Sequence, residues 1–151
     1  MVHLQMRIYL DSCSLQRPLD DQTQARIRVE AEAVMMILAA AQTGDIVLLN
    51  SEALEYEAGR IPNEQRRAEV QAMLNLAREH LKITDEAEAL AVNLEAHGIS
   101  PIDAVHLAIA STAKADFFAT CDDRFIRKAR EVPGLGCRIV SALNLVTEAL
   151  R

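Results

Sequence analysis

The amino-acid sequence predicts a three-layer α/β/α domain built on a central parallel sheet. Short apolar segments typical of strands alternate along the chain with longer segments of helical periodicity. This alternation indicates a parallel sheet covered by helices on both faces. The length of 151 residues suits one domain. No repeat, low-complexity stretch or linker rich in Gly, Pro or Ser interrupts the chain, so we expect a single domain over residues 1–151.

Strands are expected where short apolar segments are bounded by polar residues. Met6, Ile8 and Leu10 alternate with other residues at a period of two, and Asp11 ends the segment. Residues 46–49 are wholly apolar, which is typical of a strand buried on both faces. In chain order, the expected strands cover residues 6–10, 46–49, 81–83, 117–120 and 138–140.

Helices are expected where apolar residues recur at helical spacing between capping residues. Gly44 follows the first of these segments and is a common C-terminal signal. Ser51 and Thr84 are N-cap residues, and Ser100 is followed by a proline at the first helical position. In chain order, the expected helices cover residues 20–42, 52–59, 64–79, 85–97, 102–114, 124–131 and 143–150.

Composition and charge exclude several classes of protein. Half of the residues are hydrophobic, which excludes a disordered chain. Aromatic residues make up only 3% and Trp is absent, so a platform that stacks single-stranded bases is not expected. The formal net charge is −6, whereas a general nucleic-acid-binding coat is basic. Any contact with RNA or DNA is therefore expected to be local or bridged by cations.

Cysteine usage and hydropathy predict a cytoplasmic protein with no membrane association. Cys13, Cys121 and Cys137 are odd in number and lack CxxC spacing, which argues against a disulfide framework or a zinc site. Reduced thiols are typical of the cytosol. The longest apolar run, residues 33–41, is too short to cross a bilayer, and the N-terminal segment lacks the features of a signal peptide.

Acidic residues lie at or near the ends of the predicted strands. Asp11 follows the first strand directly, Asp122 follows the fourth by two residues, and Asp103 lies in the first turn of a helix. The carboxyl ends of parallel strands share one edge of the sheet, so we expect these acids to converge there with Glu55 or Glu57. Carboxylates held close together repel one another and recruit a cation. Oxygen ligands favour Mg²⁺ or Mn²⁺, which suits phosphodiester hydrolysis.

Each acid also has a structural interpretation. Asp11 alone is compatible with a residue that only ends a strand. Asp103 alone is compatible with a favourable charge at a helix N-terminus, worth about 0.3–1 kcal/mol. For a single acid at such a position, the structural role is the more frequent one, and the spacing of the acids does not decide between the two roles.

Three segments of the chain resemble the motifs of the PIN domain family. Residues 8–12 (IYLDS) resemble the opening strand and first acid of the family. Residues 100–108 (SPIDAVHLA) resemble the helix of its third acid, and residues 118–125 (FATCDDRF) resemble its Thr-x-Asp strand end. The order of the segments fits as well, and the resemblance extends over residues 7–140. The family consists of metal-dependent ribonucleases, and small bacterial members are often VapC-type toxins of toxin–antitoxin pairs.

The resemblance implies roles for individual residues. It makes Asp11, Asp103 and Asp122 ligands of Mg²⁺ or Mn²⁺ and members of the catalytic site. The second acid of the family lies on the helix after the second strand, often six residues past a capping serine. That spacing indicates Glu57 as the fourth catalytic acid, with Glu55 as the alternative.

Neighbouring side chains are expected to support this site. By the resemblance, Ser12 and Thr120 are polar supports near the metal, and the role of Asp123 stays open. His106 lies on the same helical face as Asp103 and is placed to position substrate or an acid, although such a histidine is more often a packing residue. Basic runs are usually solvated helix faces. Here three basic residues follow the last acid and are expected to contact RNA phosphates: Arg124, Arg127 and Lys128.

The sequence therefore predicts a metal-dependent endoribonuclease that hydrolyses RNA phosphodiester bonds, of the VapC toxin type, with a small antitoxin as partner. The resemblance also implies a homodimer. Residues 60–79 carry an apolar stripe, which is expected either to form the dimer surface or to cover the sheet. The alternative function is a PIN-like RNA- or protein-binding module that does not cut. A phosphatase or receiver is disfavoured, because the first strand ends in a single acid and position 13 is Cys.

Overall fold

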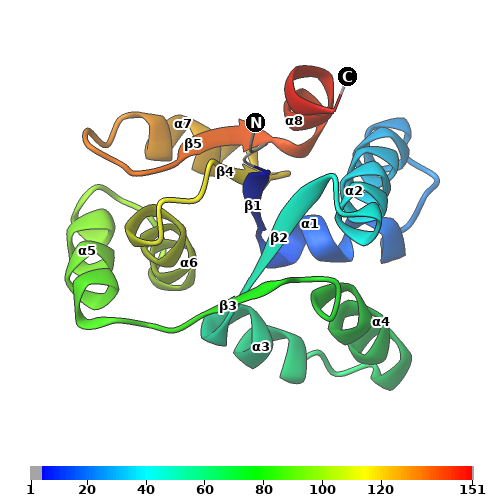
Figure 1. Ribbon diagram of the computed structural model, residues 1–151, viewed down its shortest axis with the longest axis horizontal. Coiled ribbons are helices and arrows are strands. Elements are labelled where there is room, and N and C mark those ends of the chain that lie inside the picture. The colour runs from blue at the N-terminus through cyan, green and yellow to red at the C-terminus, as the bar shows by residue number, and fades with distance from the viewer. Residues whose placement is uncertain (1–4, 151) are drawn as a thin grey trace.

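A computed structural model describes residues 5–150 and contains a five-stranded sheet at its centre (Figure 1). The strands are β1 (Met6–Leu10), β2 (Ile46–Ser51), β3 (Glu79–Leu81), β4 (Phe117–Thr120) and β5 (Arg138–Ser141). Their order is β3-β2-β1-β4-β5, and every pairing is parallel. The predicted parallel sheet is confirmed, and β1 is its central strand.

Helices lie on both sides of this sheet. The helical elements are α1 (Ser12–Gln16), the 3-10 turn η1 (Arg17–Leu19), α2 (Ala25–Thr43), α3 (Glu52–Gly59), α4 (Glu64–Leu74), α5 (Asp85–Ala96), α6 (Pro101–Thr112), α7 (Asp123–Arg130) and α8 (Ala142–Ala149). Figure 1 shows α2, α4 and α8 on one side of the sheet and α5, α6 and α7 on the other. The predicted three-layer α/β fold is confirmed.

The central strand is buried on both faces. Ile8, Tyr9 and Leu10 are successive residues that point to opposite faces, and none is more than 1% exposed. The ring of Tyr9 stacks on that of Phe118 in β4, with ring centroids 5.4 Å apart. The period-two pattern therefore predicts the strand correctly, but neither face of β1 is exposed to solvent, because helices cover both faces of the sheet.

The chain after β1 forms a short helix that the sequence did not predict. The side chain of Asp11 caps α1 by accepting a hydrogen bond from Ser14 N at 3.1 Å. A helix this short is hidden from an analysis of apolar periodicity. The following helix begins at Ala25 rather than at residue 20, because Asp21 accepts a hydrogen bond from Thr23 N and holds a turn there.

The helix predicted over residues 64–79 was too long at its C-terminal end. α4 ends at Leu74, and Arg78 N already donates a hydrogen bond to Leu48 O in β2 at 3.1 Å. The chain therefore joins the sheet at Arg78, and β3 begins at Glu79, two residues before the start of the strand predicted over residues 81–83. The remaining predicted elements lie within two residues of the observed bounds.

The apolar stripe of residues 60–79 is divided between the core and an open groove. Val70 and Leu74 are each 1% exposed and belong to the hydrophobic core of the same chain. Met73 is only partly buried and lines a groove on the surface. Part of the stripe therefore covers the sheet, and a homodimer stays a prediction.

Two expectations from composition also have structural counterparts. Cys13, Cys121 and Cys137 are all free, in accord with the absence of a disulfide framework. Within residues 5–150, no helix has both the length and the apolar character needed to cross a membrane.

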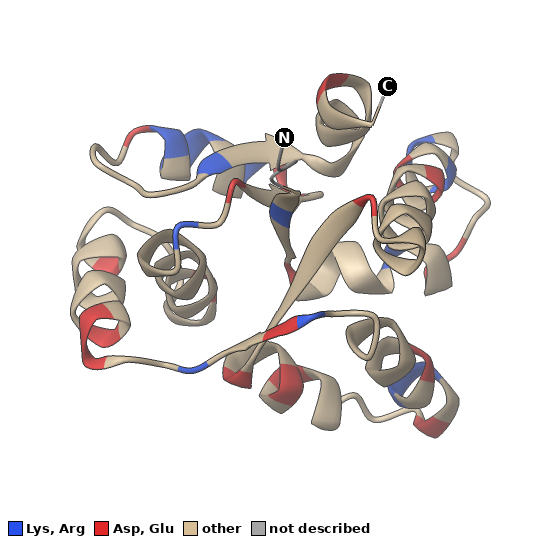
Figure 2. Cartoon of the chain, viewed as in Figure 1, with Lys and Arg blue, Asp and Glu red and all other residues tan. Residues whose placement is uncertain are grey.

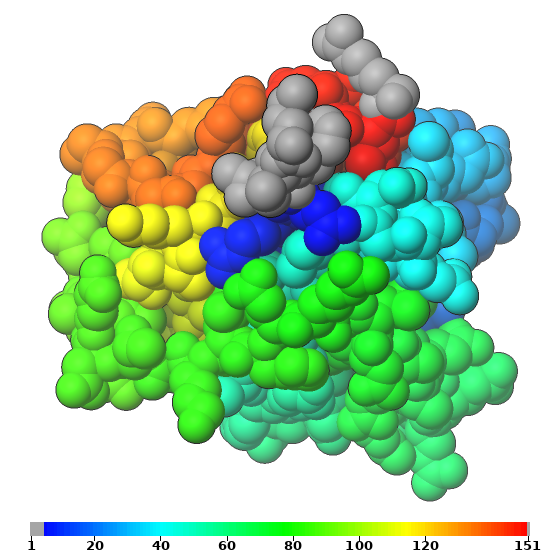
Figure 3. All heavy atoms as spheres, viewed as in Figure 1, coloured from blue at the N-terminus to red at the C-terminus, as the bar shows by residue number. Residues whose placement is uncertain are grey.

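Arg7 connects the central strand to the edge strand of the sheet. Its guanidinium donates hydrogen bonds to both carboxylate oxygens of Glu79 in β3, at 2.7 and 2.9 Å, across the intervening strand β2. Figure 3 shows the blue start of the described chain bordering the green residues of the β3 region. The hydrogen bond from Arg7 is the main cause of the lowered pKa of Glu79.

The ion pair of Arg7 and Glu79 predicts a pH-dependent contribution to stability. The pKa of Glu79 is lower in the folded state, so the ionised carboxylate stabilises the fold above its unfolded pKa, and this contribution is lost as the pH falls through the folded pKa. Glu79→Gln is expected to lower the free energy of unfolding at pH 7 by less than about 1 kcal/mol, since the pair is partly exposed. The difference from wild type should disappear once both states are protonated.

Urea denaturation at neutral and acidic pH measures this difference. Glu148→Gln is the control, because Glu148 forms a more exposed ion pair with Arg138 and should change stability less. An equal loss of stability at both pH values would contradict the assignment to ionised Glu79.

Candidate functional site

The carboxyl ends of the central strands bring the predicted acids to one edge of the sheet. β1 leads directly into Asp11, and β4 leads through Cys121 to Asp122. β1 and β4 are neighbouring parallel strands, with Leu10 paired to Ala119, so both acids leave the sheet at the same edge. This edge is where ligands bind in open parallel sheets.

Asp11 is a buried carboxylate, with 7% of the residue exposed. It accepts hydrogen bonds from Ser14 N and from the thiol of Cys13, with the sulfur 3.2 Å from Oδ1. Burial raises the pKa of Asp11, and hydrogen bonds from Thr120 and Ser14 oppose that rise. The pocket therefore penalises an uncompensated negative charge, and a cation bound beside Asp11 would relieve this penalty.

Thr120 links the ends of the two strands. Its buried hydroxyl accepts a hydrogen bond from Asp122 N at 3.1 Å and lies 3.5 Å from the sulfur of Cys13. Asp122 caps α7, because its Oδ1 accepts hydrogen bonds from Arg124 N and Phe125 N. Thr120 therefore fixes the backbone that leads from β4 to Asp122.

Asp103 is half-buried in the first turn of α6 and accepts a hydrogen bond from the hydroxyl of Ser100 at 2.8 Å. Ser100 occupies the N-cap position as predicted, but its hydroxyl donates to Asp103 instead of capping the helix. Asp103 and Asp122 line one hollow of about 470 Å³ together with Arg124 and Lys128. Figure 2 shows how strongly basic residues are concentrated on α7.

Glu57 is held by a network of hydrogen bonds among buried side chains. Nε2 of His106, which is 2% exposed, contacts Oε1 of Glu57, and Nδ1 of the same ring lies 2.6 Å from the hydroxyl of Tyr9. An ionised carboxylate only accepts, so Nε2 donates to Glu57, and in the tautomer with its proton on Nε2 the Nδ1 atom accepts the Tyr9 proton. Tyr9 O in turn accepts from the hydroxyl of Ser51 at 2.7 Å. His106 is thus buried, as a packing residue is, and it also contacts an acid.

Three other predicted site residues do not line the hollow that contains Asp103 and Asp122. Glu55 accepts a hydrogen bond from the amide of Asn50, whereas Glu57 lines a hollow beside Ser12. Asp123 forms an ion pair with Arg26 at 2.7 Å. Arg127 does not line the hollow that contains Arg124 and Lys128.

The four acids do not form a preassembled cluster. Among residues 5–150, no group of three or more His, Cys, Asp or Glu side chains is arranged to hold a metal ion. Each acid has its own hydrogen-bond donor: Ser14 N for Asp11, His106 for Glu57, Ser100 for Asp103 and α7 for Asp122. Mutual repulsion in the absence of a cation favours such separate arrangements.

The family of the chain follows from its sequence as a whole. The sequence profile of the PIN domain family matches residues 8–131, which include all four acids. The chain belongs to the PIN domain family. No curated protein matches this PIN domain by sequence.

Solved structures share the fold of this PIN domain at low sequence identity. VapBC2 from Rickettsia felis, bound to a DNA fragment from its promoter, matches with a TM-score of 0.61 and 15% identity, over 90% of this chain and 98% of the other. DNA-bound VapBC from Salmonella typhimurium matches with a TM-score of 0.57 and 17% identity, over 91% of this chain and 98% of the other. At these identities the similarity concerns the fold.

The donor atoms at the edge of this PIN domain fit Mg²⁺ or Mn²⁺ chemically. Asp11, Asp103 and Asp122 offer carboxylate oxygens, and Thr120 adds a hydroxyl. These are the hard ligands that both ions prefer. Burial raises the pKa of Asp11, so a cation beside this carboxylate would favour its ionised form. Asp103 and Asp122 would have to move toward Asp11 to share one ion with it, because the described residues hold no preassembled group of this kind.

Sequence reasoning missed two residues of this edge. Tyr9 supports Glu57 through His106, and its only sequence signal is a polar hydroxyl within a buried strand. Cys13 contacts both carboxylate oxygens of Asp11. The sequence signal for Cys13 is its position two residues after Asp11, which also excludes the Asp-x-Asp motif of a phosphatase.

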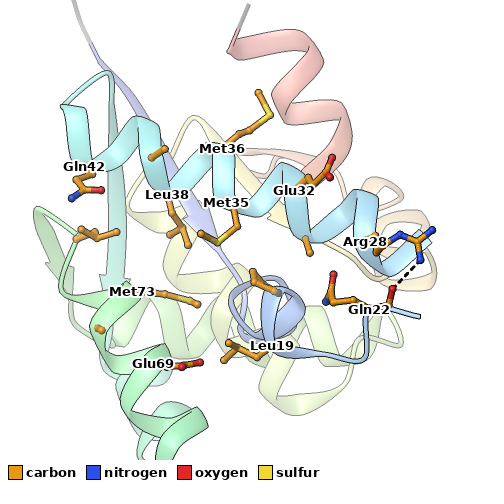
Figure 4. A pocket seen from close by; sticks show the side chains of 15 residues that line it. Leu19, Gln22, Arg28, Glu32, Met35, Met36, Leu38, Gln42, Glu69 and Met73 are labelled. Atoms are coloured by element: carbon orange, nitrogen blue, oxygen red, sulfur yellow. Dashed lines mark hydrogen bonds between the residues drawn. The ribbon is translucent and has the colours of Figure 1, made fainter. Parts of the chain in front are cut away.

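A separate apolar groove lies between α2 and α4 and contains none of the four acids. It has a volume of about 1020 Å³ and is lined largely by the side chains of apolar residues. Figure 4 shows Met35 of α2 and Met73 of α4 directed into the space between the two helices, with Leu19 below them. Met35 is 52% exposed, so this groove is open to solvent.

The buried charge of Asp11 predicts the effect of its removal on stability. Asp11→Asn is expected to leave the melting temperature unchanged or to raise it at neutral pH, because the amide oxygen still accepts from Ser14 N while the buried charge is removed. Asp11→Ala also removes the cap and should cost about 0.5–2 kcal/mol. Thermal denaturation without divalent metal compares the two variants. A strongly destabilised Asp11→Asn would show that the ionised carboxylate supports the fold.

Proposed function

We propose that this PIN domain is a metal-dependent endoribonuclease of the VapC toxin type, which hydrolyses RNA phosphodiester bonds in the cytoplasm. The observation that carries the proposal is the hollow in which Asp103 and Asp122 lie beside Arg124 and Lys128. Acids alone would suit a structural cation, and basic residues alone would suit general anion binding. Together they provide ligands for a divalent metal and contacts for a phosphodiester backbone.

We assign metal binding to Asp11, Asp103 and Asp122, with Thr120 fixing the backbone at Asp122. When bound, Mg²⁺ or Mn²⁺ supplies a Lewis acid for a phosphoryl oxygen and lowers the pKa of a bound water. Glu57 is the fourth acid, and the hydrogen bond from His106 Nε2 fixes the position of its carboxylate. Arg124 and Lys128 contact the RNA backbone, and their positive charges locally offset the repulsion between RNA phosphates and a protein of net charge −6.

The nuclease proposal predicts a difference between two adjacent acids on α7. Asp122→Asn should lower kcat/KM for a generic single-stranded RNA by about a hundredfold or more, because a charged metal ligand is lost. It should also weaken Mn²⁺ binding in calorimetric titration. Asp123→Asn is the matched control, since Asp123 pairs with Arg26 away from the hollow, and cleavage should stay near wild type.

Chelation separates the nuclease from the non-catalytic module. EDTA should abolish cleavage by the wild type, and added Mg²⁺ should restore it. A wild-type protein that binds RNA but cuts none at any Mg²⁺ or Mn²⁺ concentration would favour the binding module. Equal cleavage by Asp122→Asn and wild type would contradict the assigned site.

We further propose that an antitoxin protein inserts an apolar helical segment into the groove between α2 and α4. Two solved structures with this fold are VapBC complexes, and the open, methionine-lined groove has the character of surfaces that accept amphipathic helices. The charges at its rim, Arg28, Glu32 and Glu69, have both signs, so apolar contact rather than charge is expected to dominate.

A single charge in the groove tests this partner. Met35→Glu should abolish copurification of the protein encoded by the neighbouring reading frame, because it places a charge against the apolar segment. Val92→Glu is the control, since Val92 is 68% exposed on α5, on the opposite side of the sheet. Copurification that survives Met35→Glu would show that the partner binds elsewhere.

A further inference from the structure

Tyr56 is the exposed exception among the aromatic residues. The chain contains two Tyr, three Phe and no Trp. Tyr9 and the three phenylalanines are at most 7% exposed and belong to the core, whereas Tyr56 is 61% exposed. A single exposed aromatic ring is common on protein surfaces and does not by itself indicate a binding site. Whether Tyr56 belongs to a binding site therefore depends on the residues around it.

The ring of Tyr56 lies beside the candidate catalytic acids. Tyr56 immediately precedes Glu57 in α3, and both line a hollow of about 650 Å³ together with Ser12 and Ile102. That volume lies within the range of about 300–1,000 Å³ that is usual for ligand sites. Ile102 is 40% exposed and immediately precedes Asp103 in α6. Two exposed apolar side chains of this hollow, Tyr56 and Ile102, are therefore the direct neighbours of two of the four acids.

A positive charge is held at the same place. The guanidinium carbon of Arg60 lies 5.2 Å from the centroid of the Tyr56 ring, within the range of a cation–π contact. In the described part of the chain, no carboxylate pairs with Arg60. Arg66, the other arginine of this hollow, instead contacts Asp20 and Gln16 and fixes α4 to the segment before α2. Arg60 is thus the cation that an anionic ligand in this hollow would meet.

We propose that this hollow is a nucleotide subsite, in which Tyr56 stacks on one unpaired base of single-stranded RNA and Arg60 contacts an adjacent phosphate. The inference rests on the proposed nuclease function, because it places the base next to the acids that act on the scissile phosphate. A base within a duplex is covered by its neighbours, so only an unpaired base presents a face to Tyr56. The scarcity of aromatic residues does not prevent stacking; it limits stacking here to one position.

The chemistry of the hollow also determines how selective this subsite is. Stacking on a tyrosine ring accepts every base, because each base has a π face. The apolar side chain of Ile102 adds contact area without a hydrogen-bond pattern. The subsite therefore fixes which nucleotide is unpaired and where it lies relative to the cut, and selects weakly for base identity.

Cleavage assays test the subsite with two substrates. One is a short single-stranded RNA, and the other is bis(p-nitrophenyl) phosphate, a phosphodiester without bases. For Tyr56→Ala, the ratio of kcat/KM for RNA to kcat/KM for the diester should fall about tenfold, mainly through a higher KM for RNA. Tyr56→Phe keeps the ring and should restore the wild-type ratio. Val92→Ala, an exposed apolar change on α5, should leave the ratio unchanged.

Binding measured without turnover separates this inference from the proposed function. In EDTA, Tyr56→Ala should weaken binding of a labelled single-stranded RNA about tenfold, and an RNA lacking one base at the contacted position should bind both proteins equally. Cleavage and binding by Tyr56→Ala at wild-type levels would overturn the subsite while the nuclease proposal stands. Binding that depends on Tyr56 in a protein that never cuts would support the subsite and overturn the nuclease. Wild-type protein that binds no RNA in EDTA and cuts none with Mg²⁺ or Mn²⁺ would overturn both.

Discussion

The hydroxyl of Tyr9 is the contact on which the geometry of the site depends. It lies at the centre of the molecule, where Tyr9 is fully buried, and burial strongly raises its pKa, so the phenol stays protonated. A buried hydroxyl is costly unless it is hydrogen-bonded, and here it contacts Ser51 at the end of β2 and His106 on α6. Ser51 in turn caps α3, and His106 contacts Glu57 on that helix. One phenol thus sets the position of the helix that carries Glu57 and Tyr56.

The acids around this contact are kept apart by individual donors, which has an electrostatic consequence. A protein that held all four carboxylates together without a cation would lose stability through repulsion and desolvation. Here Asp11 alone is deeply buried, and the others lie at helix starts or against His106. The energetic cost of the site is therefore concentrated on Asp11. If Asp103 and Asp122 moved toward a metal, each would give up a hydrogen bond at the start of its helix, from Ser100 or from Arg124 N, and gain a bond to the metal.

Much of this architecture could be predicted from the sequence because its signals are local. The wholly apolar run of β2, the capping Ser51 and the proline at the start of α6 each act over a few residues. The end of α4 could not be predicted, because Arg78 leaves the helix to bond with Leu48, which is 30 residues earlier in the chain. The choice between Glu55 and Glu57 was open for the same reason. It depends on Asn50 and His106, and the sequence does not reveal which acid faces which partner.

The position of β1 at the centre of the sheet has a consequence for folding during synthesis. This central strand has its partner β2 some 40 residues away, but its other partner, β4, more than 100 residues away, as the bond between Arg7 N and Asp116 illustrates. Pairings of such long sequence separation carry a large loop-closure cost and slow the folding of parallel sheets. During synthesis, the edge that joins Asp11 to Asp122 cannot exist until β4 and Asp122 have been made. A growing polypeptide therefore carries Asp11 for more than 100 residues of synthesis before the acid of the neighbouring strand is present.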